Sequence, residues 1–337
     1  MTRADAPELL LTGATGFVGR HVLEATASAG TRRGVVALVR HASEWEKLDW
    51  TGPLDGVRLV EGSLEDVSRR ERELGPISAI LHLAAPVEHS RRAPASMRTV
   101  IVEGTLELVR LAARTRSRLV VASTSGTVGC TRERGPQADE NAPFASDVVG
   151  GWPYYAAKIE MERRARELAT ELGVDLVFVR PPILLGPGDH RLRSTRNVWK
   201  FLNGKMPFLI RGGMAFTDVR DAARALLRAV DHPDPRPVYH LDGAECEVTE
   251  FFGMLSEVSG VPVTRIVLPY RIAWIVARAL ERFHVVPDPV VIEMAAHWWG
   301  IRSLYSAADL DWKPRDPRET LRDTVEWLRH HGPRDEH

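Results

Sequence analysis

Short apolar runs alternate with longer segments of helical periodicity through the first half of the chain. Continuous runs of Val, Ile and Leu are typical of strands that are buried on both faces of a parallel sheet. We expect strands at residues 8–12, 35–39, 57–60, 79–84, 119–122 and 174–179. Strand followed by helix, repeated, predicts an α/β fold with a doubly wound parallel sheet, the Rossmann arrangement.

The helices between these strands have recognisable ends. We expect one helix at 17–29, ended by Gly30, and another at 154–172, opened by Pro153 and ended by Gly173. Proline is favoured at the first helical position and glycine just beyond the last.

The pattern changes after Arg180, where proline and glycine interrupt the sequence. Further elements are expected as a helix near 195–202, a strand end and helix within 216–230, a strand at 238–241 that returns to the sheet, and a final helix near 319–330. We therefore predict a nucleotide-binding domain of residues 1–185 plus about 217–242. A smaller, mostly helical substrate domain would comprise about 186–216 plus 243–337.

Composition narrows the functional classes. The 45 basic and 45 acidic residues balance, whereas a dedicated nucleic-acid binder needs a basic face. Two distant cysteines, Cys130 and Cys246, cannot build a disulfide framework or a zinc site of four thiolates. No apolar run reaches the length of a membrane span, and no secretion signal is visible. We expect a cytoplasmic protein without a metal, a nucleic-acid partner or a membrane span.

A glycine-rich turn follows the first expected strand and leads into a helix. Residues 12–19 read Thr-Gly-Ala-Thr-Gly-Phe-Val-Gly. Glycine lets the backbone turn sharply and approach a pyrophosphate, whose charge meets the free N–H groups at the helix start. The spacing alone would also suit a tight turn without a ligand, but the strand-turn-helix context favours dinucleotide binding.

Arg40 lies at the end of the second expected strand, 21 residues beyond Gly19. An acidic side chain at this position binds the ribose 2′-hydroxyl of NAD, and a basic one accommodates the 2′-phosphate of NADP. Arg40, with Lys47 following, favours NADP and leaves NAD possible. The alternative is that Arg40 is an ordinary solvated arginine.

Tyr154 and Lys158 are four residues apart on one expected helix, so their side chains share a face. Only five tyrosines and five lysines occur in the chain, which makes a chance pair uncommon. A nearby ammonium favours the phenolate and brings the phenol toward a useful pKa for proton transfer. Tyr155 is the competing phenol.

Hydroxyl side chains follow the strand expected at 119–122. Ser123, Thr124 and Ser125 lie where ligands bind in open parallel sheets. One of them would hold a substrate oxygen against the tyrosine, and the others would cap the loop.

Together these motifs resemble the extended branch of the short-chain dehydrogenase/reductase family, also called the NAD-dependent epimerase/dehydratase family. The nearest subgroup is the one of dihydroflavonol reductases and 3β-hydroxysteroid dehydrogenases. The stretches that carry the resemblance are 12–19, 83–85, 123–128, the pair Tyr154 and Lys158, 180–187 and 216–221.

The resemblance implies a role for each matching residue. Ser125 would be the catalytic serine, Tyr154 the general acid/base, and Lys158 the holder of the nicotinamide ribose. Gly13, Gly16 and Gly19 would cradle the pyrophosphate, Ala84 and Ala85 would line the adenosine side, and 181–184 would flank the nicotinamide. The full expected cofactor set is Gly13, Thr15, Gly16, Phe17, Val18, Gly19, Arg40, Lys47, Ser63, Leu64, Leu83, Ala84, Ala85, Tyr154, Lys158, Pro181, Ile183 and Leu184.

Two positions depart from the family pattern. Ser63 replaces an aspartate that grips the adenine, and Ile101 replaces a polar residue. The resemblance also implies a homodimer through the helices near 95–114 and 154–172.

The leading hypothesis is an oxidoreductase that interconverts a ketone or aldehyde and an alcohol with NADP(H). An NAD-dependent nucleotide-sugar epimerase and a non-catalytic dinucleotide sensor are the alternatives. Sugar dehydration is disfavoured, because Ser125 and Gly126 stand where those enzymes carry an Asp-Glu pair. The apolar stretch from Tyr270 would form a lid over a hydrophobic substrate, touch a membrane surface, or simply pack as a helix.

Overall fold

The computed structural model describes residues 8–28, 33–48, 50, 54–91, 93–280 and 289–333. Its centre is a seven-stranded sheet in which every neighbouring pair is parallel. The strand order is β11-β7-β5-β4-β1-β2-β3. The bounds are β1 (Glu8–Thr12), β2 (Val35–Val39), β3 (Val57–Glu61), β4 (Ile77–His82), β5 (Arg118–Ala122), β7 (Leu176–Arg180) and β11 (Val238–His240). The expected doubly wound α/β fold is confirmed.

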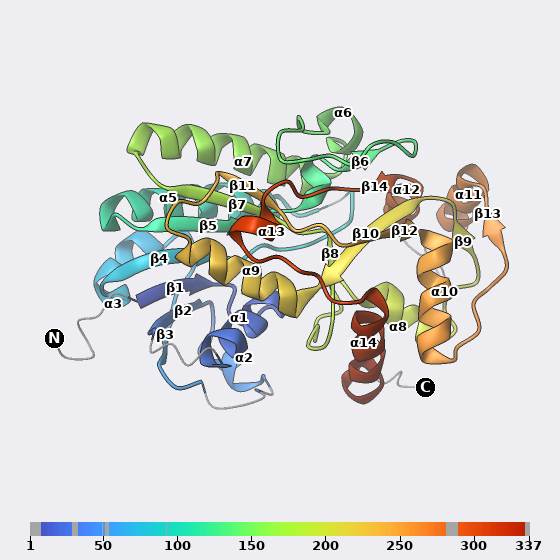
Figure 1. Ribbon diagram of the computed structural model, residues 1–337, viewed down its shortest axis with the longest axis horizontal. Helices are drawn as coiled ribbons and strands as arrows, with labels where there is room; N and C mark the ends of the chain where they lie inside the picture. Colours follow the sequence, from blue (N-terminus) through green and yellow to red (C-terminus); the bar gives the residue numbers. More distant parts are fainter. Residues whose placement is uncertain are drawn as a thin grey trace.

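Helices cover both faces of this sheet. Figure 1 shows α5 (Gly104–Thr115) and α7 (Pro153–Leu172) on one side, and α1 (Phe17–Ser28) and α9 (Val219–Asp231) on the other. The alternation of side chains along a strand feeds both layers. Leu10 of β1 joins the core beneath α5 and α7, whereas Leu9 and Leu11 join the core beneath α1 and α9.

Most expected boundaries agree with the structure to within a residue or two. β4 begins and ends two residues before the expected 79–84, so Leu83 and Ala84 lie in the loop after it. β7 begins at Leu176 rather than at 174. The expected helix at 17–29 ends at Ser28, and Ala29 and Gly30 lie outside the described residues.

The other helical segments in the first half are short. They are α2 (Ala42–Glu46), η2 (Val67–Arg70), α3 (Glu71–Leu74), α4 (Ala95–Arg98), a π-helical turn η3 (Thr99–Glu103), a 3-10 turn η4 (Ser125–Thr127) and α6 (Ser146–Val149). The π-helical turn joins α4 to α5, so the expected helix near 95–114 is continuous but irregular.

Most of the rest of the chain forms small sheets and helices at one end of the large sheet (Figure 1). A three-stranded sheet has the order β12-β10-β8, and two-stranded pairs join β13 to β9 and β14 to β6. The strands are β6 (Cys130–Thr131), β8 (Ile183–Leu185), β9 (Leu209–Ile210), β10 (Gly213–Asp218), β12 (Ala244–Glu247), β13 (Val267–Leu268) and β14 (Trp298–Trp299). The helices are α8 (Arg196–Leu202), α10 (Val248–Ser259), α11 (Tyr270–Leu280), α12 (Pro289–Ala295), α13 (Ser306–Asp309) and α14 (Pro317–His331).

The chain reverses its direction of winding between β1 and β4, which are neighbours in the large sheet. Such a switch point opens a crevice at the carboxyl ends of the strands, where open parallel sheets bind ligands. The loops after β1, β4, β5 and β7 therefore carry the candidate site. Within the described residues, no helix is both long enough and apolar enough to cross a membrane.

Candidate active site

The glycine turn lies between β1 and α1. Gly13 has a φ of +75°, and an added Cβ would lie 2.7 Å from the Ala84 nitrogen. An added Cβ at Gly19 would lie 2.2 Å from the Gly13 oxygen, so close packing of the helix start on the turn requires this glycine. At Gly16 only the Gly13 oxygen, at 3.1 Å, comes within 4 Å. The first and third glycines therefore shape the turn, and the second has open space beside it.

The loop after β4 is fastened to the glycine turn through Thr12. The Thr12 hydroxyl accepts a hydrogen bond from the Ala84 N–H (3.3 Å) and is bonded to Nδ1 of His82 (2.7 Å). Nε2 of His82 is bonded to the Thr105 hydroxyl on α5 (3.1 Å). Burial, and secondarily the charge of Lys158, lowers the pKa of His82 to about 3, so this imidazole is neutral. His82 thus connects the turn to α5.

The end of β2 presents an accessible guanidinium. Arg40 follows β2 directly, its side chain is 68% exposed, and its one ion pair among the described residues is with Glu44 at 3.7 Å. Glu44 also binds Arg191 at 3.0 Å. Lys47, at the end of α2, is exposed as well. Both basic groups are therefore available to an anionic ligand.

The predicted adenine-side residues lie in the turn after β3. The Ser63 hydroxyl donates to the Asp66 carboxylate (3.1 Å) and accepts from the Asp66 N–H (3.2 Å). Leu64 is buried against Gly104, where an added Cβ would lie 2.8 Å from its Cδ1. Ser63 thus caps its own turn.

Lys158 is buried on α7 and is only 4% exposed. Its ammonium donates a hydrogen bond to the carbonyl of Ala122, the last residue of β5, at 3.0 Å. Burial lowers the pKa of Lys158 to about 8, and the nearby Glu162 carboxylate opposes that shift. The lysine thus stands at the carboxyl end of β5 with a proton that it loses as the pH rises through about 8.

Tyr154 lies one helical turn before Lys158 and is also buried. Its ring meets the rings of His89 and Tyr155 edge-on, with centroids 5.6 and 5.2 Å apart. Burial raises the pKa of Tyr154 above its ordinary value. This direction is opposite to the lowering expected from Lys158, and it keeps the phenol protonated at neutral pH.

Tyr155, the competing phenol, packs against the serine loop. An added Cβ on Gly126 would lie 2.2 Å from Cε1 of Tyr155. The Tyr155 ring centroid also lies 5.3 Å from that of Trp299 and 6.0 Å from that of Trp152. Tyr155 is therefore part of an aromatic cluster with Trp152 and Trp299 that packs against the serine loop.

The hydroxyls after β5 have different partners. The Thr124 hydroxyl accepts from the Gly126 N–H (3.3 Å), and the Ser123 hydroxyl donates to Glu162 (2.6 Å). Ser125 is 8% exposed, and its hydroxyl has no hydrogen-bond partner among the described residues. Its N–H donates to the Pro181 carbonyl (2.9 Å), which joins the serine loop to the loop after β7. Thr124 therefore caps the loop, and Ser123 fastens the end of β5 to α7.

Sequence reasoning missed a buried ion pair behind Lys158. Glu162, fully buried, accepts hydrogen bonds from Nε and Nη2 of Arg180 at 3.0 and 2.6 Å. It also accepts from Ser123 and from Arg166 (2.9 Å). The sequence contains a signal that could have indicated Glu162, because this residue continues the four-residue spacing of Tyr154 and Lys158. Glu162 thus supports the strand end that holds the lysine.

The loop after β7 presents an apolar side chain. Pro181 and Leu184 are buried, whereas Ile183, the first residue of β8, is 43% exposed. Ile183 follows Pro181, whose carbonyl accepts the hydrogen bond from the Ser125 N–H, so this side chain lies near the serine loop, where the nicotinamide contact is predicted.

The residues present fit a nicotinamide nucleotide. The open space at Gly16 and the N-terminus of α1 lie after the carboxyl end of β1. The exposed Arg40 and Lys47 lie after β2, and the exposed Ile183 lies after β7. The predicted site residues thus lie on one edge of the sheet, as a dinucleotide across a switch point requires.

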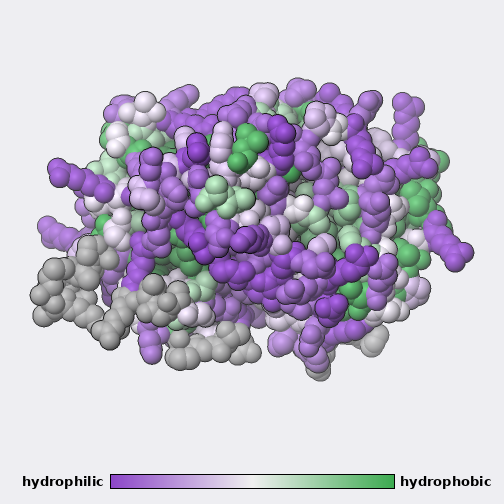
Figure 2. Space-filling model, viewed as in Figure 1, coloured by the Kyte–Doolittle hydropathy of each residue, from purple (hydrophilic) through white to green (hydrophobic). Residues whose placement is uncertain are grey.

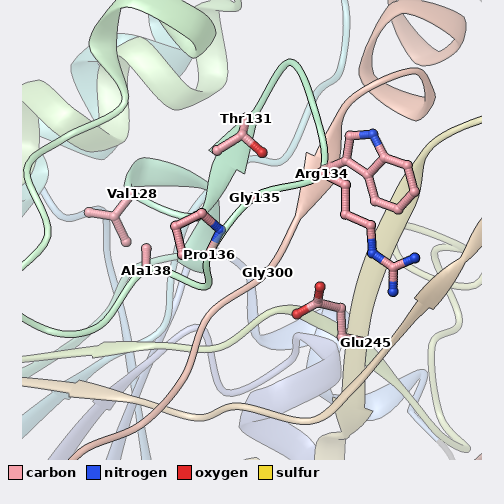
Figure 3. A pocket seen from close by; sticks show the side chains of 10 residues that line it. Val128, Thr131, Arg134, Gly135, Pro136, Ala138, Glu245 and Gly300 are labelled. Atoms are coloured by element: carbon pink, nitrogen blue, oxygen red, sulfur yellow. The ribbon is translucent and has the colours of Figure 1, made fainter.

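A small pocket lies where β6 meets β14, directly after the serine loop (Figure 3). Arg134 and Glu245 are among its lining residues, and its volume of about 20 Å³ suffices for one water molecule. None of the predicted site residues lines it.

Comparison with known proteins decides the family. The family model described as the NAD dependent epimerase/dehydratase family matches residues 9–241. The chain belongs to this family. It is an NAD(P)-dependent oxidoreductase of the short-chain dehydrogenase/reductase type, as its motifs predicted.

Individual relatives are distant but similar in length. The chain is 27% identical to sterol demethylase protein B of Methylococcus capsulatus, covering 96% of this chain and 98% of that protein. It is 26% identical to a putative dihydroflavonol 4-reductase of Synechocystis sp., covering 98% and 96%. The crystal structure of gox2253 superimposes with a TM-score of 0.80 at 24% identity, covering 97% of this chain and 99% of that one, which supports the fold.

Proposed function

We propose that this enzyme reduces a ketone or aldehyde to an alcohol, and catalyses the reverse oxidation, with NADP(H) as cofactor and Ser125, Tyr154 and Lys158 as its catalytic residues. The buried Lys158, held by the Ala122 carbonyl one helical turn from Tyr154, is the observation that carries this proposal. Relatives called reductases accord with it.

Each residue has a distinct task in this mechanism. When bound, the reduced nicotinamide supplies a hydride for the carbonyl carbon. Tyr154, whose pKa is raised by burial, holds the proton that the carbonyl oxygen receives. Ser125, whose hydroxyl has no hydrogen-bond partner within the described part of the chain, donates a hydrogen bond that orients that oxygen. Lys158 binds the nucleotide ribose and stabilises negative charge left on the phenol.

The preference for NADP rests on Arg40. Its exposed guanidinium stands directly after β2, where a 2′-phosphate is bound in this fold. Glu44 is held by Arg191, so the nearest carboxylate is engaged elsewhere. Binding of NAD in place of NADP remains the competing prediction.

The proposed function is tested by a cofactor titration followed by an NADPH-oxidation screen against ketones, aldehydes and nucleotide sugars. We expect tighter binding of NADPH than of NADH and oxidation of NADPH with at least one carbonyl compound. Protein that purifies with tightly held NAD and converts a nucleotide sugar without net oxidation would instead identify an epimerase. Tight NADPH binding without turnover of any compound would identify a sensor.

Two further predictions from the family resemblance accompany this proposal. The homodimer would form through α5 and α7, and the enzyme would act in the cytoplasm on a small substrate. The dimer is testable by light scattering with a charge-reversal variant on the outer face of α7.

A further inference from the structure

Six large apolar side chains are exposed within ten residues of the chain. They are Ile266, Val267, Tyr270, Ile272, Trp274 and Ile275, with exposed fractions between 38% and 61%. We call them the 266–275 patch. In the rest of the described chain, exposed large apolar side chains occur singly, at Leu172, Ile183 and Leu304. Clustered exposure of this kind marks an interaction surface, whereas scattered exposure is ordinary.

The construction of α11 explains why these side chains face outward. Its buried positions, Ala273 and Ala277, are small and pack with Ile210 of β9 and Ile292 of α12. The large residues Ile272, Trp274 and Ile275 lie on the remaining faces. Figure 2 shows hydrophobic residues at the right-hand end of the molecule, where Figure 1 places α11 and β13. This end is remote from α5 and α7, the predicted dimer helices.

Basic side chains outnumber acidic ones around the 266–275 patch among the described residues. No Asp or Glu occurs between Glu257 and Glu281, and the same stretch carries Arg265, Arg271 and Arg278, all exposed. Among the described residues, Glu293 of α12 faces Tyr270 from a neighbouring element, and it forms an ion pair with Arg91 at 2.5 Å. The surface is therefore apolar and basic.

We propose that the 266–275 patch docks the enzyme onto the surface of an anionic lipid bilayer. Trp and Tyr side chains favour the boundary between headgroups and acyl chains. Arginine stems lie along apolar surface while their charges reach the phosphates. A helix that combines apolar residues with arginines lies in such an interface without spanning the membrane.

A second copy of the chain is a poorer occupant of this surface. In a symmetric dimer the same patch meets itself, so Arg265 and Arg271 of one copy would face those of the other. The stretch has no acidic side chain to offset that repulsion. Anionic headgroups supply the complementary charge.

The test is flotation with vesicles of phosphatidylcholine alone and of phosphatidylcholine mixed with phosphatidylglycerol. We expect the protein to float with the mixed vesicles only, and high salt to weaken the association. The double variant Ile272→Ser/Ile275→Ser should lower the vesicle-bound to free ratio about tenfold or more. Arg265→Gln/Arg271→Gln should also lower it.

The matched control is Leu172→Ser/Leu304→Ser, which removes two similarly exposed apolar side chains elsewhere. It should float like the unchanged protein. Unchanged thermal unfolding and NADPH binding would show that all variants are folded. Failure of the unchanged protein to float with mixed vesicles would overturn the proposal, as would equal losses in the control. Self-association that Ile272→Ser/Ile275→Ser abolishes, without vesicle binding, would assign the patch to a second copy instead.

Discussion

Arg40 offers a positive charge at the position where this fold distinguishes the two nicotinamide nucleotides. Its guanidinium is 68% exposed and makes one long contact with Glu44. Such an exposed guanidinium can bind a phosphate at little cost in free energy, because it does not have to leave a buried position or break a strong ion pair.

Replacement of Arg40 by serine should remove the preference for NADP. We expect the Kd for NADPH to rise about tenfold or more, the value of a lost charge-assisted hydrogen bond, with the Kd for NADH nearly unchanged. Arg134→Ser is the matched control, since Arg134 is 71% exposed and also pairs with a glutamate at 3.7 Å. Titration with both nucleotides measures the effect. Equal weakening of both nucleotides would remove Arg40 from this role.

Two glycines of the turn between β1 and α1 have separable tasks. An added Cβ at Gly19 would lie 2.2 Å from the backbone of Gly13, whereas at Gly16 the contact is 3.1 Å. The added Cβ at Gly19 would collide with the protein's own backbone. The added Cβ at Gly16 would instead fill the space beside the turn where a pyrophosphate would approach.

Gly19→Ala should therefore destabilise the fold, by about 1–3 kcal/mol, the typical cost of overpacking. Gly16→Ala should largely preserve stability and weaken NADPH binding, by about tenfold or more for a displaced hydrogen bond to a charged group. Chemical denaturation and nucleotide titration are to be done on both variants. Identical behaviour of the two would contradict the assigned division of roles.

Helix α7 carries Tyr154, Lys158 and Glu162 at intervals of four residues, so all three side chains share one face. Burial lowers the pKa of Lys158 to about 8, and Glu162 opposes the shift. The Lys158 side chain is therefore charged below about pH 8, and it loses its proton and its charge as the pH rises through that value. If Lys158 must be charged, kcat/KM for carbonyl reduction falls over that range.

Glu162→Gln removes the group that raises the pKa of Lys158, so the alkaline fall of kcat/KM should move to lower pH. The substitution also breaks the buried pair with Arg180, which costs about 3–5 kcal/mol of stability, so the profile is measured well below the midpoint of unfolding. Glu160→Gln, on the exposed side of α7, is the control and should keep the original profile. An unchanged profile in Glu162→Gln would contradict this positioning role.

At the scale of the whole molecule, the predictable parts were those determined by local sequence. The core strands were found because continuous apolar runs reflect burial on both faces, and the glycine turn because its neighbours are a strand and a helix. Short strands such as β14 were missed, because Trp298 pairs with Thr131, far away in the chain. A two-residue strand has no periodicity to recognise.

The same distinction applies to the site. The spacing of Tyr154 and Lys158 could be predicted, since one helix fixes both positions. The network of Ser123, Glu162 and Arg180 joins β5, α7 and β7, so only the assembled fold reveals it. The predicted lowering of the Tyr154 pKa was also wrong. Burial raises this pKa, and the burial of a side chain is known only from the assembled fold.

The most direct test compares Tyr154→Phe with Tyr155→Phe, two neighbouring losses of a phenol hydroxyl. NADPH oxidation is measured with a carbonyl substrate from the screen, together with the Kd for NADPH. We expect Tyr154→Phe to lower turnover by about 100- to 10,000-fold, as for a lost general acid, with the Kd nearly unchanged. Tyr155→Phe should stay close to the unchanged enzyme. Near-normal turnover in Tyr154→Phe would contradict the proposed chemistry.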